Sequence, residues 1–84
     1  TPLPEEVDVG LWEALRECRR EQAEEQGVPP YVIFHDSTLI EMCTRLPQTR
    51  DEFANLTGVG ERKLLKYGDA FLTAIRRAQD EAIT

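Results

Sequence analysis

The spacing of apolar residues predicts one amphipathic helix over residues 9–26, because apolar positions recur there at three- and four-residue steps. Asp8 is placed to cap its N-terminus, since a short side-chain oxygen accepts hydrogen bonds from the first free amides of a helix. The opposite side of the helix is polar, with glutamates and arginines spaced for i,i+4 ion pairs. The inward positions are Leu11, Trp12, Leu15, Cys18, Gln22 and Ala23.

Gly27 and two consecutive prolines end this helix and make a corner. Proline fixes its own φ and disfavours helical geometry in the residue before it, so we expect Val28 and Pro29 to be extended. The rigid corner sets the directions of the apolar residues that follow it, residues 31–34. Some of these side chains must enter the core, and the rest must face solvent. An outward-facing Tyr31 would be a ready contact.

A second long apolar pattern predicts a helix that begins at Asp36 or Ser37 and ends near Leu46, before a proline. Thr38 and Glu41 have the spacing of a capping box, in which each side chain bonds the other residue's backbone amide. This pattern gives the corner a helix on either side.

Shorter helical patterns follow, separated by glycines. A capping-box pattern starts a short helix over residues 49–56, and a glycine-made break at residues 58–60 precedes a helical pattern over residues 61–67. Gly68 is expected to interrupt the chain before a last helix over residues 69–82. Without a credible pair of strands, the predicted fold class is all-α, a small orthogonal bundle of about five helices with a SAM-like arrangement.

The length of 84 residues predicts one small domain. Residues 1–7 are interpreted as a linker or frayed terminus and residues 8–84 as the domain. No apolar run approaches the ~20 residues that cross a bilayer, and the N-terminus lacks a signal-peptide pattern. We therefore expect a soluble, intracellular protein that makes no contact with a membrane.

Few residues offer chemistry of their own. Cys18 and Cys43 lie far apart on apolar helix stripes, which favours two reduced core thiols, and a single histidine makes a metal site improbable. His35, Asp36 and Ser37 are adjacent, but the Asp and Ser are better used as helix starters than as a catalytic triad. With no phosphate-binding P-loop or dinucleotide motif, we expect no catalysis and no cofactor in this domain.

The net charge of −6 is unevenly distributed. Residues 1–25 carry eight acidic and three basic residues, whereas residues 49–84 carry six of each. The acidic part is concentrated on the polar side of the first helix and is a candidate protein-interaction face. Its members are Glu13, Glu17, Glu21 and Glu24.

Two features are candidates for nucleic-acid contact. The segment Leu56-Thr57-Gly58-Val59-Gly60 looks like the hairpin of a helix-hairpin-helix element, whose free amides at a helix N-terminus could bind a phosphate. Any tight turn between helices also uses glycine, so a structural role is equally supported. The second feature is Tyr31, whose ring could stack on a base or instead cover a helix end in the core.

Four segments resemble the HRDC domain, the module shared by RecQ-type helicases and ribonuclease D. They are residues 11–20, Gly27-Val28-Pro29-Pro30-Tyr31-Val32-Ile33-Phe34, Asp36-Ser37-Thr38-Leu39-Ile40-Glu41-Met42 and Leu56-Thr57-Gly58-Val59-Gly60-Glu61-Arg62-Lys63-Leu64. The resemblance covers residues 11–78. The form Pro-Pro-Tyr-Val-Ile-Phe is more similar to the bacterial RecQ branch than to ribonuclease D.

The resemblance implies a small helical bundle that is linked to a helicase core and has no ATPase site itself. It implies a parent ATP-dependent 3′–5′ DNA helicase of DNA repair and recombination in the bacterial cytoplasm, with ATP and Mg²⁺ as cofactors and zinc as a further candidate. The residues that match the family's DNA contacts are Tyr31, Gly58, Gly60, Arg62, Lys63 and Lys66, with Arg45 and Arg50 as weaker additions.

Two mechanisms are consistent with this resemblance. A sequence pI near 4.7 favours a monomeric accessory module that regulates the parent's DNA binding through contacts of its acidic face with the helicase core or another protein, since nucleic-acid-binding domains usually present a basic patch. The alternative is a module that binds single-stranded or structured DNA directly, through Tyr31 and the basic cluster Arg62, Lys63 and Lys66.

Overall fold

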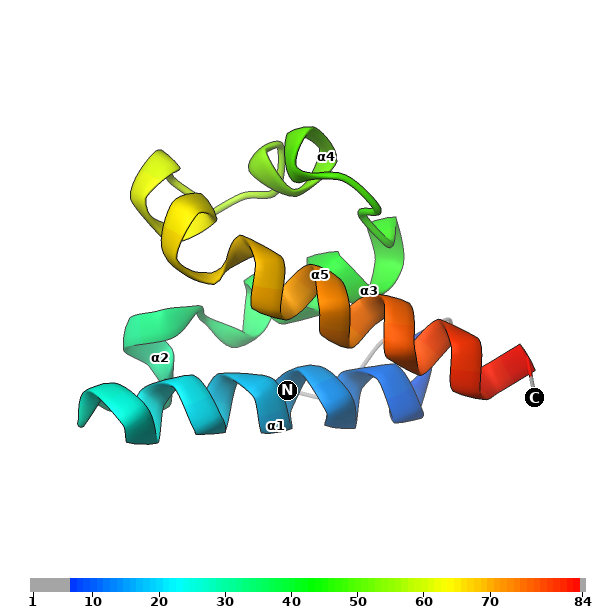
Figure 1. Ribbon diagram of the computed structural model, residues 1–84, viewed down its shortest axis with the longest axis horizontal. Helices are drawn as coiled ribbons and strands as arrows, with labels where there is room; N and C mark the ends of the chain where they lie inside the picture. The colour runs from blue at the N-terminus through cyan, green and yellow to red at the C-terminus, as the bar shows by residue number, and fades with distance from the viewer. Residues whose placement is uncertain (1–6, 84) are drawn as a thin grey trace.

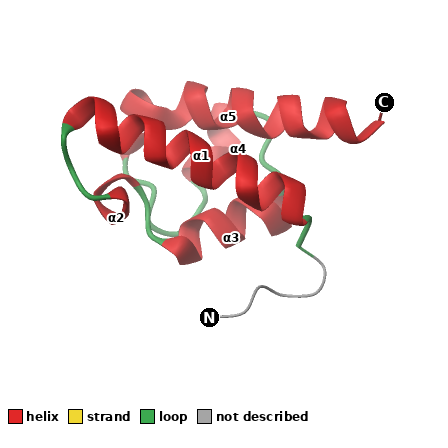
Figure 2. Ribbon diagram, turned by 90° about the horizontal axis from the view of Figure 1, so that it is seen from below, coloured by secondary structure: helices red, strands yellow, loops and turns green. Residues whose placement is uncertain are grey.

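The computed structural model describes residues 7–83, and within this range it is all helical, with no strand. This confirms the predicted all-α class. The two longest helices run antiparallel side by side, and the remaining three cover one side and one end of this pair (Figures 1 and 2). The five helices are α1 (Val9–Gln26), α2 (Pro30–Ile33), α3 (Asp36–Arg45), α4 (Arg50–Ala54) and α5 (Glu61–Ile83).

Helix α1 has the predicted boundaries because local signals set both of its ends. Asp8 Oδ1 accepts hydrogen bonds from the amides of Gly10 (2.8 Å) and Leu11 (3.4 Å). At the other end Gly27 takes a left-handed φ of 67°, and the amide of Val28 donates to the Ala23 carbonyl. The predicted cap and the predicted glycine stop are both confirmed.

The corner after α1 is partly helical. Pro29 is extended as predicted (φ −64°, ψ 151°), but the next four residues form α2 and not an extended run. Proline at the first helical position has its φ set for a helix, and the Val32 amide donates to the Pro29 carbonyl at 3.0 Å. One turn of helix divides the apolar run: Ile33 and Phe34 are buried, whereas Tyr31 and Val32 are exposed.

Helix α3 begins at Asp36 as predicted, but the predicted capping box is wrong. Thr38 and Glu41 both lie inside the helix and bond to a distant residue instead. Thr38 Oγ1 donates to the carbonyl of Thr57 (3.0 Å), and Glu41 Oε2 accepts from the Thr57 amide (3.1 Å). These two bonds fix the glycine-containing loop against α3.

Helix α4 is shorter than predicted and ends at Ala54. Thr49 caps it, since its side chain accepts from the Glu52 amide at 3.1 Å. The Glu52 carboxylate accepts from the amide of Gln48 at 2.7 Å, one residue before the position that a capping box would use.

Helix α5 is continuous, so the predicted interruption at Gly68 is wrong. Gly68 is buried inside the helix, and a Cβ added there would lie 3.0 Å from Leu64 Cδ1. A glycine costs a helix interior only about 1 kcal/mol, which the burial of a continuous apolar face outweighs. The buried side chains of this face are Tyr67, Phe71, Leu72 and Ile75.

Phe34, directly after α2, lies at the centre of the core with none of its surface exposed. Its ring meets three others edge-on: Phe53 at a centroid distance of 6.0 Å, Tyr67 at 5.9 Å and Phe71 at 5.0 Å. Such pairs contribute about 0.5–1.5 kcal/mol each beyond the burial of area. The corner is therefore fixed to both α4 and α5.

The predicted linker at residues 1–7 lies outside the described residues except for Val7. Val7 is 6% exposed and belongs to the core. The extent of the linker stays a prediction, with the folded part reaching at least to Val7.

Candidate nucleic-acid interface

Tyr31 projects from the rigid corner into solvent. Its side chain lies on α2 and the residue is 61% exposed, and its ring is stacked on that of His35, with centroids 6.2 Å apart and planes at 26°. Val32 beside it is 42% exposed. Because the corner is held by prolines on one side and by the buried Phe34 on the other, this aromatic surface is presented in a fixed orientation.

The first turns of α5 lie at the same end of the molecule as α2 (Figure 1). Lys63 connects the two elements, with its Nζ 5.5 Å from the centroid of the Phe34 ring. Lys66 Nζ lies 5.6 Å from the ring of Tyr67, whose hydroxyl donates to Gln26 Oε1 at 2.8 Å. The structure therefore places Lys63 beside the ring of Phe34, directly after α2, and Lys66 beside the ring of Tyr67, near the C-terminal end of α1.

Arg62 lies in the same first turn of α5 and is exposed. Glu61, next to it, is also exposed and reduces the local positive charge. The cluster of Arg62, Lys63 and Lys66 therefore carries three positive charges within two turns of helix, against one acidic neighbour in that helix segment.

The two glycines of the hairpin have different surroundings. Gly58 has φ +87°, and a Cβ there would lie 2.8 Å from Thr38 Oγ1, so this position faces the protein. Gly60 has no atom within 4 Å of an added Cβ, and its carbonyl accepts from the Leu64 amide at the start of α5. The part of the hairpin that is open to a ligand is thus Gly60 and the first amides of α5, which have no partner within their own helix.

The weaker candidates Arg45 and Arg50 are engaged elsewhere. Arg45, the last residue of α3, pairs with Glu41 (Nε to Oε2, 3.4 Å). Arg50, the first residue of α4, pairs with Asp69 (Nε to Oδ1, 3.7 Å). The structure does not bring either of them to the corner.

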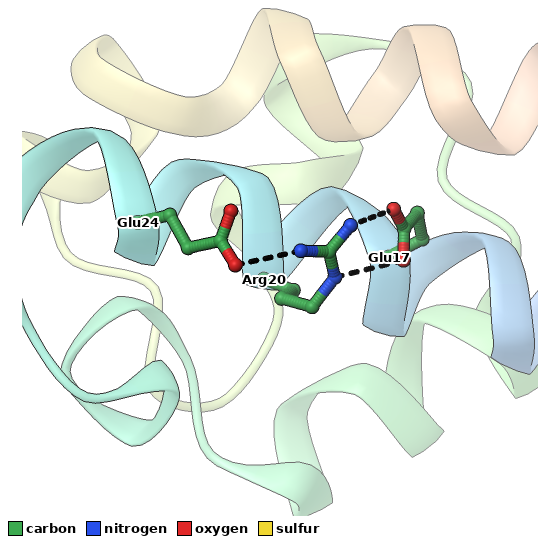
Figure 3. Close-up of polar contacts among 3 residues, drawn as sticks. All are labelled: Glu17, Arg20 and Glu24. Atoms are coloured by element: carbon green, nitrogen blue, oxygen red, sulfur yellow. Dashed lines mark hydrogen bonds and ion pairs between the residues drawn. The ribbon is translucent and has the colours of Figure 1, made fainter.

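The acidic face of α1 is partly neutralised by one arginine (Figure 3). Arg20 lies between Glu17 and Glu24, with Nε 3.0 Å from Glu17 Oε2 and one terminal nitrogen 2.7 Å from Glu24 Oε1, and it makes a second contact with Glu17. The hydrogen bonds between Glu17 and Arg20 lower the pKa of the Glu17 carboxyl group and raise the pKa of the Arg20 guanidinium. Among the described residues, Glu13 and Glu21 form no ion pair, so the four glutamates are not equivalent.

Arg19 was not among the functional residues predicted from the sequence. Its side chain is 10% exposed; one terminal nitrogen donates to the Phe34 carbonyl at 3.0 Å and lies 2.8 Å from Asp36 Oδ1, while the buried Nε has no partner. Arg19 thus ties α1 to the residues that follow α2. The spacing indicates that Arg19 is buried, because it stands four residues after Leu15 and four before Ala23 on the buried stripe of α1.

The described residues contain no group of three or more metal-ligating side chains and no helix long and apolar enough to span a membrane. Cys18 and Cys43 are not disulfide-bonded, and burial raises the pKa of both thiols to about 11. Neither thiol therefore has the low pKa of a reactive cysteine.

Comparison with known proteins links this geometry to one family. The HRDC domain model matches residues 8–75. The ATP-dependent DNA helicase RecQ of Bacillus subtilis is 52% identical over 66 residues, which are 79% of this chain and 11% of that protein. The ATP-dependent DNA helicase UvrD2 of Mycobacterium tuberculosis is 39% identical over 71 residues, 84% of this chain and 10% of the relative. The chain therefore spans about a tenth of the length of these relatives.

A solved structure has the same fold. The third HRDC domain of Deinococcus radiodurans RecQ superimposes with a TM-score of 0.83 at 40% sequence identity, and the match covers 86% of this chain and 95% of that one. Since that structure consists almost entirely of the matched region, that HRDC domain is folded without the rest of its helicase.

Proposed function

This chain belongs to the HRDC domain family, and on that premise we propose that it is a non-catalytic accessory domain of a RecQ-type DNA helicase that adjusts which DNA the helicase engages. We assign ATP hydrolysis and 3′–5′ unwinding, with ATP, Mg²⁺ and any zinc, to the rest of the parent polypeptide, in the bacterial cytoplasm. The small share of the relatives' length that the chain spans supports this division.

The mechanism best supported by the geometry is direct contact with a single DNA strand at the corner. The observation that carries it is the exposure of Tyr31, at 61%, on a corner whose orientation is fixed by buried neighbours. Stacking of a base on an aromatic ring contributes about 1–3 kcal/mol, and a pre-oriented ring loses little entropy on binding. His35, stacked on Tyr31, extends the same surface.

Positive charge near this ring would hold the strand's phosphates. Lys63 lies 5.5 Å from the ring of Phe34, three residues after Tyr31, and Arg62 and Lys66 lie within the same two turns of α5. Screening limits surface electrostatics to about 8 Å at physiological salt. The local cluster can therefore attract a phosphate although the net charge of the chain is −6.

The test is the affinity of the isolated domain for a labelled single-stranded oligonucleotide, measured by fluorescence anisotropy. Tyr31→Ala should weaken binding about tenfold or more, because one stacked base is lost, whereas Tyr31→Phe should retain most of the affinity. Lys63→Glu should also weaken it, while Arg45→Glu, which changes the charge equally at a position away from the corner, should have a smaller effect. Unchanged affinity in both Tyr31→Ala and Lys63→Glu would refute strand contact at this site.

A second mechanism has its own support in the charge of α1. Glu13 and Glu21 are exposed and form no ion pair within residues 7–83, so they remain available to a basic protein surface. Docking of this acidic face on the helicase core would regulate DNA binding without contact between the domain and DNA.

This second mechanism is tested in the full-length helicase. Reversing both charges, Glu13→Lys with Glu21→Lys, should change the helicase's preference between single-stranded and structured DNA. An unchanged preference would rule out regulation through the acidic face.

A further inference from the structure

We propose that the groove between α1 and α5 is a docking site for a basic amphipathic helix from another part of the parent helicase. The inference rests on the second mechanism proposed above, regulation through the acidic face, and makes its contact surface specific. Neither Tyr31 nor the basic cluster takes part in it.

The groove runs between the two antiparallel helices, which lie side by side in both views (Figures 1 and 2), and it has a volume of about 370 Å³. Small side chains leave this space open, because they do not fill the gap between the two helices. A third helix could place a ridge of its own side chains there, as in other helix-in-groove complexes. The small lining residues are Ala14 and Cys18 on α1 and Ala70, Thr73, Ala74 and Ala78 on α5.

The charged residues around the groove are mostly acidic. Glu17, Glu21 and Glu81 line it, and the only basic lining residue among those described is Arg77. Arg20 pairs with both Glu17 and Glu24, so its single positive charge does not neutralise both of these carboxylates. A helix with small apolar residues on one face and lysine or arginine at its flanks matches this lining, whereas a nucleic-acid strand would be repelled by it.

The size of the groove favours an occupant on the same polypeptide. A standard interface between separate proteins involves about 20–30 residues a side, whereas eleven of the described residues line this groove. A tethered segment is present at an effective concentration of about 1 mM, so a weak contact suffices. The relatives are some nine times longer than the region matched to this chain, since it covers 11% of the Bacillus subtilis protein. A second copy of this chain, with its own net charge of −6, lacks the required charge.

Cys18 reports occupancy of the groove directly, because it lines the groove and is only partly buried. The measurement is the alkylation rate of Cys18 by N-ethylmaleimide, followed by mass spectrometry in the isolated domain and in the full-length helicase. With a Kd of about 0.1 mM and an effective concentration of about 1 mM, docking would slow alkylation about tenfold in the full-length protein. Cys43, which is buried, serves as an internal control for unfolding.

Two variants identify the groove. Glu21→Lys, at the rim, should abolish the protection of Cys18, whereas Glu13→Lys, the same charge change on the same helix outside the groove, should preserve it. Because the charge of Glu21 also raises the pKa of Cys18, each variant is judged by its ratio of rates in the two proteins. Ala74→Leu, which narrows the groove from α5, should also bring this ratio to one while alkylation of Cys43 stays slow.

Other outcomes would overturn the proposal in distinguishable ways. Equal rates in the isolated domain and the full-length helicase would mean that the groove is open. Equal loss of protection in Glu13→Lys and Glu21→Lys would indicate docking by the whole acidic face, which preserves the second mechanism but removes the groove. Protection that depends on helicase concentration would identify a second copy of the helicase as the occupant. Protection that survives both charge reversals would exclude a basic occupant.

Discussion

Replacing Gly58 by alanine should destabilise the domain by about 2–3 kcal/mol, for two reasons that the structure separates. The φ of +87° at this position is unfavourable for any residue with a Cβ, at about 1–2 kcal/mol. The new Cβ would also lie 2.8 Å from Thr38 Oγ1, so the hydroxyl must move and give up its bond to the Thr57 carbonyl, which is worth about 1 kcal/mol. Gly60→Ala, at an open position without positive φ, is the matched control and should be nearly neutral.

The assay is unfolding by urea and by heat, each followed by circular dichroism. For a domain of this size a loss of 2 kcal/mol corresponds to a fall in Tm of about 8–16 °C. The two reasons are separated by a double-mutant cycle with Thr38→Ala, which removes both the clash and the hydrogen bond. Gly58→Ala should then cost about 1 kcal/mol less in the Thr38→Ala background than in the wild type. Strict additivity of the two substitutions, or a Gly60→Ala loss as large as that of Gly58→Ala, would refute this explanation of the hairpin.

Three further predictions concern buried and partly buried side chains. Arg19→Met should lower the free energy of unfolding by about 1–2 kcal/mol, because the Phe34 carbonyl loses a charged donor. Removal of the unpartnered buried Nε offsets part of this loss. A loss below about 0.5 kcal/mol would contradict a stabilising contact between Arg19 and Phe34. Phe34→Leu should lower the free energy of unfolding in urea by about 2–4 kcal/mol, because three ring contacts are lost. A loss below about 1 kcal/mol would argue against a contribution from these ring contacts. Since burial raises the pKa of Cys18 and Cys43 from 9.0 to about 11, the folded protein keeps thiol protons that the unfolded chain releases, and stability should fall between pH 9 and pH 11. Replacing both cysteines by alanine should make that fall less steep, and an identical pH dependence would contradict the assignment.

The parts of the fold that were predicted correctly depend on local signals. Asp8 and Gly27 act within one turn of the helix ends they define, so the boundaries of α1 follow from neighbouring residues alone. The same holds for Thr49 at the start of α4.

The parts that were predicted wrongly depend on distant contacts. The break expected at Gly68 was overridden by the continuous burial of the apolar face of α5. Thr38 and Glu41 have the spacing of a capping box, but both bond to Thr57, nineteen and sixteen residues away along the chain. A pattern read within a few residues cannot reveal partners at such separations.

The candidate site also has features that follow from local sequence and features that depend on distant contacts. The residue types at the corner indicated contact with a nucleic acid, but the exposure of Tyr31 depends on the turn of helix that places Ile33 and Phe34 in the core. The pairing of Glu17 and Glu24 with Arg20 follows from i,i+3 and i,i+4 spacing and was foreseeable. The role of Arg19 was not, because its partners lie on the far side of the corner.

The central claim, that the corner of Tyr31 and the start of α5 hold a DNA strand, is tested most directly by the salt dependence of single-stranded DNA binding to the isolated domain. If Arg62, Lys63 and Lys66 each neutralise one phosphate, the logarithm of the association constant should fall against the logarithm of salt concentration with a slope of about −2. The triple variant in which these three residues are replaced by alanine should have a slope near zero. Absence of saturable binding even at low salt, or an unchanged slope in the triple variant, would contradict the claim and leave protein docking as the function of this domain.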